Sequence, residues 1–126
     1  MEKSLRFKLK GETTVFVDWA NVYGWKKSLK QEVDPRKLYK YLTRYKEVKH
    51  VFFYFGTDIH PKSKAFLLKI KQIGYHVITK PVKHILVAEI NGQKIYKRKC
   101  DFDIEISLKT HDLLKGDTRS FIFLTG

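Results

Sequence analysis

The sequence has little cysteine, no long apolar run and no motif for phosphate binding or nucleophilic attack. It has a single cysteine, Cys100, which excludes an internal disulfide and a cysteine-based zinc site and suits the reducing cytoplasm. No stretch approaches the roughly 18 consecutive apolar residues of a membrane span, so we expect no membrane partner. There is also no glycine-rich phosphate loop and no nucleophile motif, which argues against a phosphatase or nucleotidase.

Acidic residues are scarce relative to basic ones. The sequence has 26 Lys and Arg against 13 Asp and Glu, which gives a formal net charge of +13. Such a surplus favours polyanionic partners, nucleic acid first, although a well-solvated surface gives similar numbers. Hydrophobic residues make up 43% of the chain, enough for one folded domain spanning residues 1–126.

Apolar patterning predicts strands that alternate with helices. The expected strands are residues 13–17, 48–55, 75–79 and 120–124. Asp34-Pro35 begins one helix, and a second runs from Pro61 to a glycine cap at Gly74. Asn91-Gly92 predicts a β-hairpin insertion near residues 84–97. The order predicts an α/β fold, in which helices cover both faces of a mainly parallel sheet.

Two segments admit more than one interpretation. Residues 103–114 include apolar residues that alternate as in a strand, but Leu113-Leu114 followed by Lys115-Gly116 favours a helix. The pattern alone favours the helix narrowly. Residues 1–10 alternate basic with apolar side chains, which is typical of a short edge strand or a basic arm.

Several aspartates fall at one edge of the predicted sheet. Asp18 closes the first strand, and Asp101 and Asp103 stand at the start of the last helix. Clustered carboxylates repel one another unless a cation offsets them, and Mg²⁺ or Mn²⁺ takes one or two carboxylates with water and substrate phosphate. The alternatives are that Asp18 only caps a turn and that the other two only cap a helix. Asp58 is more typical of a turn residue.

Basic and aromatic side chains surround the same edge. The basic ones that we expect to bind nucleic acid are Lys80, Lys83, Lys97, Arg98 and Lys99. Trp19, Tyr23 and Trp25 flank Asp18, and at least one of these rings is expected to pack in the core. Cations that follow phosphates and rings that stack on bases suit a single-stranded nucleic acid.

Five blocks of sequence carry a resemblance over nearly the whole chain, from about Thr13 to Gly126. They are VFVDWANVYGW, YFGTD, GYHVITKPVK, YKRKCDFDIEISL and FIFLTG. In this order they resemble an NYN domain of the PIN-like superfamily. The resemblance implies a Rossmann-like, three-layer fold and a ribonuclease that uses Mg²⁺ or Mn²⁺ on RNA.

The resemblance also implies roles for individual residues. Asp18 would be the first metal-binding acid, and Asn21 would support it or contact the substrate. Asp103 would be the second acid, at the start of a helix, which favours the helical interpretation of residues 103–114. Asp101 and Glu105 match less regular positions.

The chain departs from the family pattern at two places. The closing strand of the family typically runs into Ser-Gly-Asp-Ser-Asp-Phe, whereas here the sequence stops at Thr125-Gly126, so we expect the C-terminal part of the domain to be missing. Lys109 stands near where many relatives have another acid and would bring a positive charge toward the metal, and Asp112 lies on a different part of the helix face. We therefore expect weak or no catalysis, with a non-catalytic RNA-binding or protein-interaction module as the alternative.

The last predicted strand also bears on association. Without further covering structure, Phe121, Ile122 and Phe123 would leave apolar surface partly uncovered. We expect self-association through that strand or marginal stability.

Overall fold

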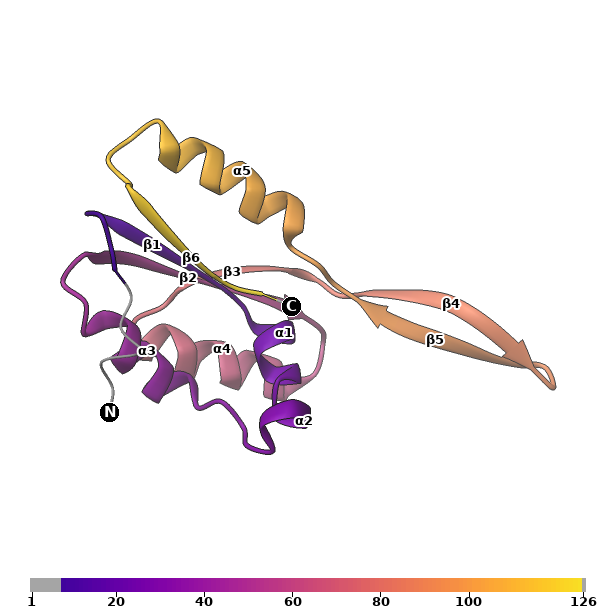
Figure 1. The fold of residues 1–126 in the computed structure, drawn as a ribbon. Helices are drawn as coiled ribbons and strands as arrows, with labels where there is room; N and C mark the ends of the chain where they lie inside the picture. The colour runs from indigo at the N-terminus through magenta and orange to yellow at the C-terminus, as the bar shows by residue number, and fades with distance from the viewer. Residues whose placement is uncertain (1–7, 126) are drawn as a thin grey trace.

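A parallel four-stranded sheet is the middle layer of the protein. The computed structural model describes residues 8–125, and the sheet has the strand order β3-β2-β1-β6 (Figure 1). Its strands are β1 (Thr13–Asp18), β2 (Val48–Thr57), β3 (His76–Pro81) and β6 (Ser120–Leu124). Because the strands are parallel, their carboxyl ends all lie at one edge of the sheet.

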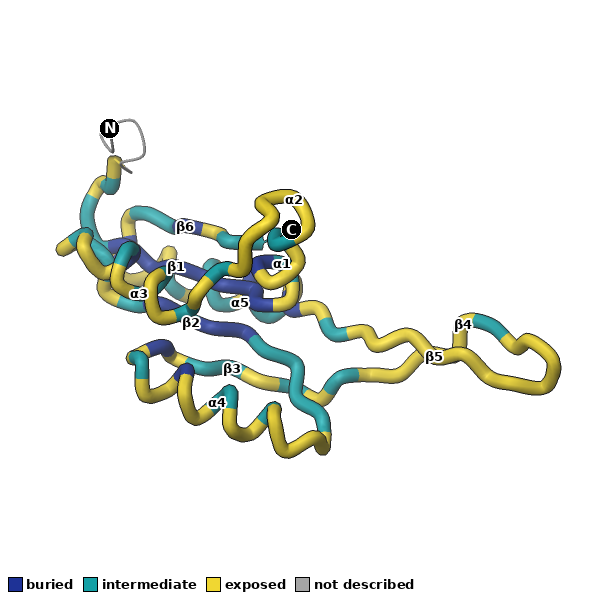
Figure 2. The backbone as a smooth tube through the Cα atoms, turned by 90° about the horizontal axis from the view of Figure 1, so that it is seen from below, coloured by how far each residue is buried: buried dark blue, intermediate teal, exposed yellow. Residues whose placement is uncertain are grey.

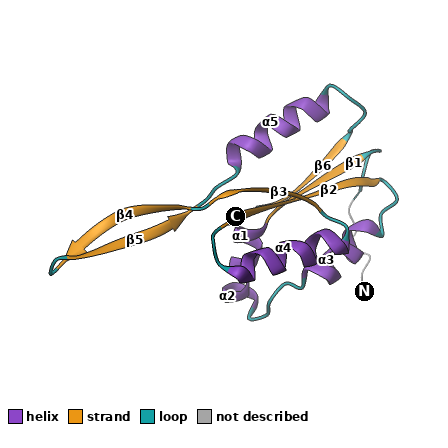
Figure 3. Ribbon diagram, turned by 180° about the vertical axis from the view of Figure 1, so that it is seen from behind, coloured by secondary structure: helices purple, strands orange, loops and turns teal. Residues whose placement is uncertain are grey.

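Helices cover both faces of this sheet, as the sequence predicts. On one side lie α1 (Trp19–Gly24), α2 (Lys26–Leu29), α3 (Pro35–Thr43) and α4 (Pro61–Ile73). On the other side lies α5 (Asp103–Leu114), and Figure 3 shows the same three layers from behind. The fold is therefore the three-layer α/β arrangement expected for a PIN-like protein, and residues 103–114 are helical.

Local sequence accounts for where the two longer helices of the first layer begin and end. The Asp34 carboxylate accepts a hydrogen bond from the backbone N–H of Arg36 at 2.9 Å, and proline stands in the first turn of α3. α4 ends at Gly74, whose φ of +129° disfavours any side chain. A Cβ there would also lie 2.6 Å from the hydroxyl oxygen of Tyr39, so glycine allows α3 and α4 to pack closely.

The core has two halves, one on each face of β1. On the α5 side, Phe16 packs with Tyr54, Phe102 and Ile106. The other half, larger, includes Val15, Val17, Trp19, Val22, Leu42, Val51, Phe53 and Ile70. All six residues of β1 are buried, which explains its continuous apolar run: a strand covered on both faces has no polar side.

The hairpin stands apart from these layers. β4 (Lys83–Ile90) and β5 (Gln93–Lys99) form a separate antiparallel sheet that projects from the body, and almost all of its residues are exposed (Figures 1 and 2). Asn91 and Gly92 make the turn with positive φ angles of 53° and 78°. The predicted insertion at residues 84–97 is confirmed, with strands that extend slightly further.

Three features differ from the sequence-based expectations. α1 and α2 were not predicted, because both are short and α1 consists mostly of residues with low helix propensity. β2 runs on through Gly56 and Thr57, which pair with the end of β3. The edge strand or basic arm expected at residues 1–10 lies largely outside the described residues, and residues 8–10 form no strand.

β6 lies at the edge of the sheet but is only partly uncovered. Ile122 is buried in the larger half of the core, and Phe121 packs against the smaller half. Phe123 stacks on Phe16 with ring centroids 5.3 Å apart and keeps 49% of its surface exposed.

Within residues 8–125, no helix combines the length and apolar character needed to cross a membrane.

Candidate active site

Asp18 is a buried acid at the carboxyl end of the central strand. It is 2% exposed, and its Oδ2 accepts a hydrogen bond from Nδ2 of Asn21 at 3.0 Å. Oδ1 is also buried and has no hydrogen-bond partner. Asp18 precedes α1, but its side chain caps none of the helix N–H groups. The backbone N–H groups of Ala20 and Asn21 nevertheless lie near enough to this carboxyl to lower its pKa, so weak capping accompanies the hydrogen bond from the Asn21 side chain.

The surroundings of Asp18 disfavour its charge. Burial raises the pKa of the carboxyl most, and the nearby Asp103 carboxylate raises it further. The hydrogen bond from the Asn21 side chain and the backbone N–H groups of Asn21 and Ala20 partly offset this rise. A buried carboxylate with a second acid beside it is the environment that a bound cation would stabilise.

One cavity of about 350 Å³ gathers the predicted acidic residues. Its lining residues are Asp18, Ala20, Asn21, Cys100, Asp101, Asp103 and Thr125. We call it the acidic cavity. The structure thus brings Asp18, Asn21, Asp101 and Asp103 together, and the cavity lies at the carboxyl edge where α/β sheets bind ligands.

The start of α5 explains why two of these acids reach the cavity. Phe102 is buried, and its ring packs against Tyr54 with centroids 5.3 Å apart. Asp101 and Asp103 flank this ring and are both exposed. Phe102 therefore fixes the start of the helix in the core while its two neighbours stay at the surface.

The donor set fits a divalent cation in part. Mg²⁺ is usually bound through one or two carboxylates, with water and substrate phosphate in its other positions. The unpaired Oδ1 of Asp18 and the exposed carboxylates of Asp101 and Asp103 supply such oxygens. Within residues 8–125, no three His, Cys, Asp or Glu side chains converge closely enough to hold a metal by themselves. Water or phosphate would therefore complete the coordination.

A second, larger cavity of about 550 Å³ adjoins the first. Its lining includes the rings of Trp19, Tyr23, Tyr54, Phe55, Phe66 and Phe102, and it shares Ala20 and Cys100 with the acidic cavity. We call it the aromatic cavity. Sequence patterns point to only a few of its residues, because most come from separate elements that only the fold brings together.

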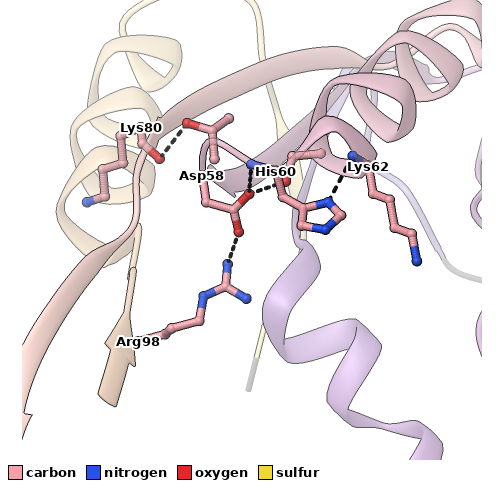
Figure 4. A network of polar contacts seen from close by, with 7 residues as sticks. Asp58, His60, Lys62, Lys80 and Arg98 are labelled. Carbon is pink, nitrogen blue, oxygen red and sulfur yellow. Dashed lines mark hydrogen bonds and ion pairs between the residues drawn. The ribbon is translucent and has the colours of Figure 1, made fainter. Parts of the chain in front are cut away.

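Asp58 and Arg98 stand at the lining of the aromatic cavity. Asp58 Oδ1 accepts hydrogen bonds from the His60 N–H at 2.9 Å and the Ser63 hydroxyl at 2.8 Å, as expected for a turn residue. Its Oδ2 pairs with Arg98 Nη2 at 3.1 Å (Figure 4). The bond from the His60 backbone is the main cause that lowers the pKa of Asp58.

The five predicted RNA-binding cations fall into two groups. Arg98 pairs with Asp58, and Lys80 Nζ lies 2.7 Å from Glu105 Oε2 and 4.8 Å from the ring centroid of Phe102. The remaining group is Lys83, Lys97 and Lys99, which make no ion pair within residues 8–125. Sequence alone could not reveal the carboxylate partners, because they lie 25 and 40 residues away in the chain.

Lys109 requires a correction. The sequence suggested that it would bring a positive charge toward the acids, but its ammonium lies 5.1 Å from the ring centroid of Phe52. In the sheet, Asp18 pairs with Tyr54, and Phe52 lies two residues before Tyr54 on the same strand. Lys109 does not line the acidic cavity. Asp112 does not line it either.

The fold is that of an α/β, PIN-like protein. Residues 12–126 match the NYN domain family, so the chain belongs to that family. The structure resembles the crystal structure of a protein of unknown function from Vibrio parahaemolyticus, with a TM-score of 0.65 and 21% sequence identity. The match covers 93% of this chain and 68% of the other, and at this identity it concerns the fold alone. No curated protein gives a significant sequence match.

Proposed function

We propose that residues 1–126 form a single NYN domain that hydrolyses single-stranded RNA with Mg²⁺ or Mn²⁺ in the cytoplasm. The observation that carries the proposal is the unpaired, buried Oδ1 of Asp18, in a cavity shared with Asp101 and Asp103. A buried polar atom without a hydrogen-bond partner lowers the stability of the folded protein, and a bound cation would provide the missing partner. NYN family membership supports the nuclease assignment.

Four residues of the acidic cavity have distinct parts in this proposal. Asp18 and Asp103 would hold the ion, with Asp101 as a further oxygen donor. Bound there, a divalent ion would activate water and stabilise charge during in-line attack on a phosphodiester. Asn21 positions Asp18, because its amide holds Oδ2 and leaves Oδ1 for the ion.

The hairpin provides a path for the RNA backbone. Lys83 pairs across the strands with Lys99, and Lys97 lies two residues from Lys99 and so on the same face. Like charges directly opposite one another destabilise a strand pair, and bound phosphates would offset that repulsion. Cys100 follows Lys99 directly and lines the acidic cavity, so the end of β5 that carries Lys97 and Lys99 adjoins the acids.

Cleavage of labelled single-stranded RNA in Mn²⁺ tests the proposal. We expect turnover, weak in view of the few converging acids, that Asp18→Asn abolishes and Asp112→Asn leaves unchanged. Asp112 lies on α5 but outside the acidic cavity, so it is a matched control for the removal of one acid. Cleavage that persists in Asp18→Asn would contradict the proposal.

The second candidate is an RNA-binding or protein-interaction module without catalysis. It is favoured by the absence, within residues 8–125, of three side chains that converge as metal ligands. Salt-dependent RNA binding without turnover, equal in the wild type and in Asp18→Asn, would support this candidate.

Self-association through β6 stays a prediction. Among the strands of residues 8–125, β6 pairs only with β1, and the half-exposed Phe123 lies on it. Analytical ultracentrifugation of the wild type and of Phe123→Ser measures the oligomeric state. We expect the wild type to form a dimer that the substitution dissociates. A monomeric wild type would contradict the prediction.

A further inference from the structure

The aromatic cavity lies directly beside the proposed cleavage site. Trp19 and Ala20, which line it, follow Asp18 in the sequence, and Ala20 and Cys100 line both cavities. We infer that the aromatic cavity binds one nucleobase of the RNA, in the nucleotide next to the phosphate at the acidic cavity. This inference rests on the proposed function and adds to it a subsite for a base.

The size and walls of the cavity suit a flat aromatic ligand. Its volume of about 550 Å³ lies within the range of roughly 300–1,000 Å³ typical of small-ligand sites. Phe66 packs with Trp19 and with Phe55, at centroid distances of 5.8 Å and 5.1 Å, and so forms a continuous aromatic wall. Nucleobases extruded from a strand bind between such rings.

Tyr23 provides the accessible ring. It lines the cavity, is 45% exposed and lies 6.0 Å from Trp19 between ring centroids. Lys26, which does not line the cavity, contacts this ring with Nζ 2.9 Å from the tyrosine hydroxyl and 4.2 Å from the ring centroid. A ring held on one side and open on the other is suited to stack on a base.

Gly56 allows the opposite wall to close. A Cβ at this position would lie 2.8 Å from both Cys100 Sγ and Val82 Cγ2, closer than real contacts allow. All three residues line the aromatic cavity. The absence of a side chain therefore lets the ends of β2 and of the hairpin meet against the cavity.

Polar groups at the cavity provide contacts for the edge of a base. Asp58 fixes the Arg98 guanidinium through one nitrogen, and Lys62 also lines the cavity. A guanidinium has five N–H donors in a rigid plane, so those that Asp58 does not use can meet acceptor atoms on a base. The base would thus stack on Tyr23 and be held at its edge by Arg98.

The test compares two oligonucleotides of equal length in EDTA, so that no cleavage occurs. One is fluorescein-labelled single-stranded RNA, and in the other tetrahydrofuran replaces every base. We expect the wild type to bind the RNA at least tenfold more tightly. Tyr23→Ala should weaken RNA binding about tenfold, the scale of removing one base–ring stack, and leave the base-free strand unaffected.

Two further variants complete the test. Tyr23→Phe retains the ring and should bind as the wild type does. Val82 lines the cavity between β3 and β4, so Val82→Trp should fill the cavity with a larger side chain and weaken binding of the RNA but not of the base-free strand. Equal effects of Tyr23→Ala on both oligonucleotides, or no effect on either, would overturn the base subsite and leave the nuclease proposal standing. If the wild type bound neither oligonucleotide in EDTA, the base subsite would be overturned, and the cleavage assay in Mn²⁺ would decide separately whether RNA is the substrate.

Discussion

Asn21 holds the carboxylate of Asp18 by one oxygen and leaves the other without a hydrogen bond. Nδ2 donates to Oδ2 at 3.0 Å, whereas Oδ1 is buried and unpaired. An unsatisfied buried acceptor costs about 1–3 kcal/mol, and more when it is charged. The pair is thus unfavourable for the protein alone and suited to a ligand that neutralises the acid.

The first prediction is that Asp18→Asn stabilises the metal-free protein at neutral pH. Burial and the Asp103 charge raise the pKa of Asp18, so its ionised form opposes folding. Asparagine has nearly the same shape, carries no charge and can still accept the hydrogen bond from Asn21. Urea denaturation in EDTA measures the change, and a lower free energy of unfolding for the variant would contradict the prediction.

The same pair of proteins has an expected pH dependence. A carboxyl whose pKa is raised on folding favours the native state below its unfolded pKa near 3.8, and this contribution is lost as the pH rises through the folded value. The stability of the wild type relative to Asp18→Asn should therefore fall as the pH rises from the unfolded to the folded pKa and be constant above it. Urea titrations of both proteins across the acid range check this sign.

The second prediction concerns metal binding by the acids on α5. At a Mn²⁺ concentration of about 100 times the dissociation constant, a bound ion stabilises the native state by about 2.7 kcal/mol. Asp103→Asn should remove most of this stabilisation, because Asp103 lines the acidic cavity. Asp112→Asn should retain it. Thermal melts with and without Mn²⁺ measure the stabilisation, and equal values in the two variants would refute the role of Asp103.

The third prediction concerns the cations of the hairpin. Replacing Lys83, Lys97 and Lys99 together by glutamine should weaken binding of single-stranded RNA. The slope of log K against log salt should become shallower by about 0.7 for each phosphate that the variant no longer neutralises. Fluorescence anisotropy over a salt series gives both quantities.

A control for this variant removes the same charge elsewhere. Three exposed lysines at the amino edge of the sheet serve: Lys40, Lys46 and Lys71. Their replacement by glutamine should change the salt slope little. If both triple variants changed it equally, net charge rather than the hairpin would account for binding.

The fourth prediction tests the packing on the α5 face. Phe16 is fully buried and stacks on Phe123 and on Phe52, with centroids 5.3 Å and 5.8 Å apart. Phe16→Ala should cost about 3–5 kcal/mol of stability. Phe123→Ala should cost less, about 1–2 kcal/mol, because half of that ring is already exposed. Chemical denaturation of both variants measures the two costs.

Sequence patterns predict most of the elements because each depends on local chemistry. Asp34-Pro35, Gly74 and Asn91-Gly92 are capping and turn signals that act within a few residues, and all three act as expected. α1 gives no such signal: it is held by Trp19 and Val22, which are buried in the core. Its existence depends on tertiary packing, which a local pattern does not contain.

The candidate site follows the same division. The meeting of Asp18 with Asp101 and Asp103 follows from parallel topology and could be predicted from the order of elements. The aromatic cavity could not, because its walls come from α1, β2, α4 and the loops around the hairpin. The position of Lys109 over Phe52 also depends on how α5 lies across the sheet, which sequence spacing leaves open.

The start of α5 separates a residue that the protein needs to fold from the residues of the proposed metal site. Phe102 is the buried residue, and the acids on either side of it are exposed and contribute little to the core. Selection can therefore exchange Asp101 or Asp103 in a descendant without disturbing the architecture. We therefore expect some homologues to keep the buried core of this segment while the acids of the proposed metal site differ.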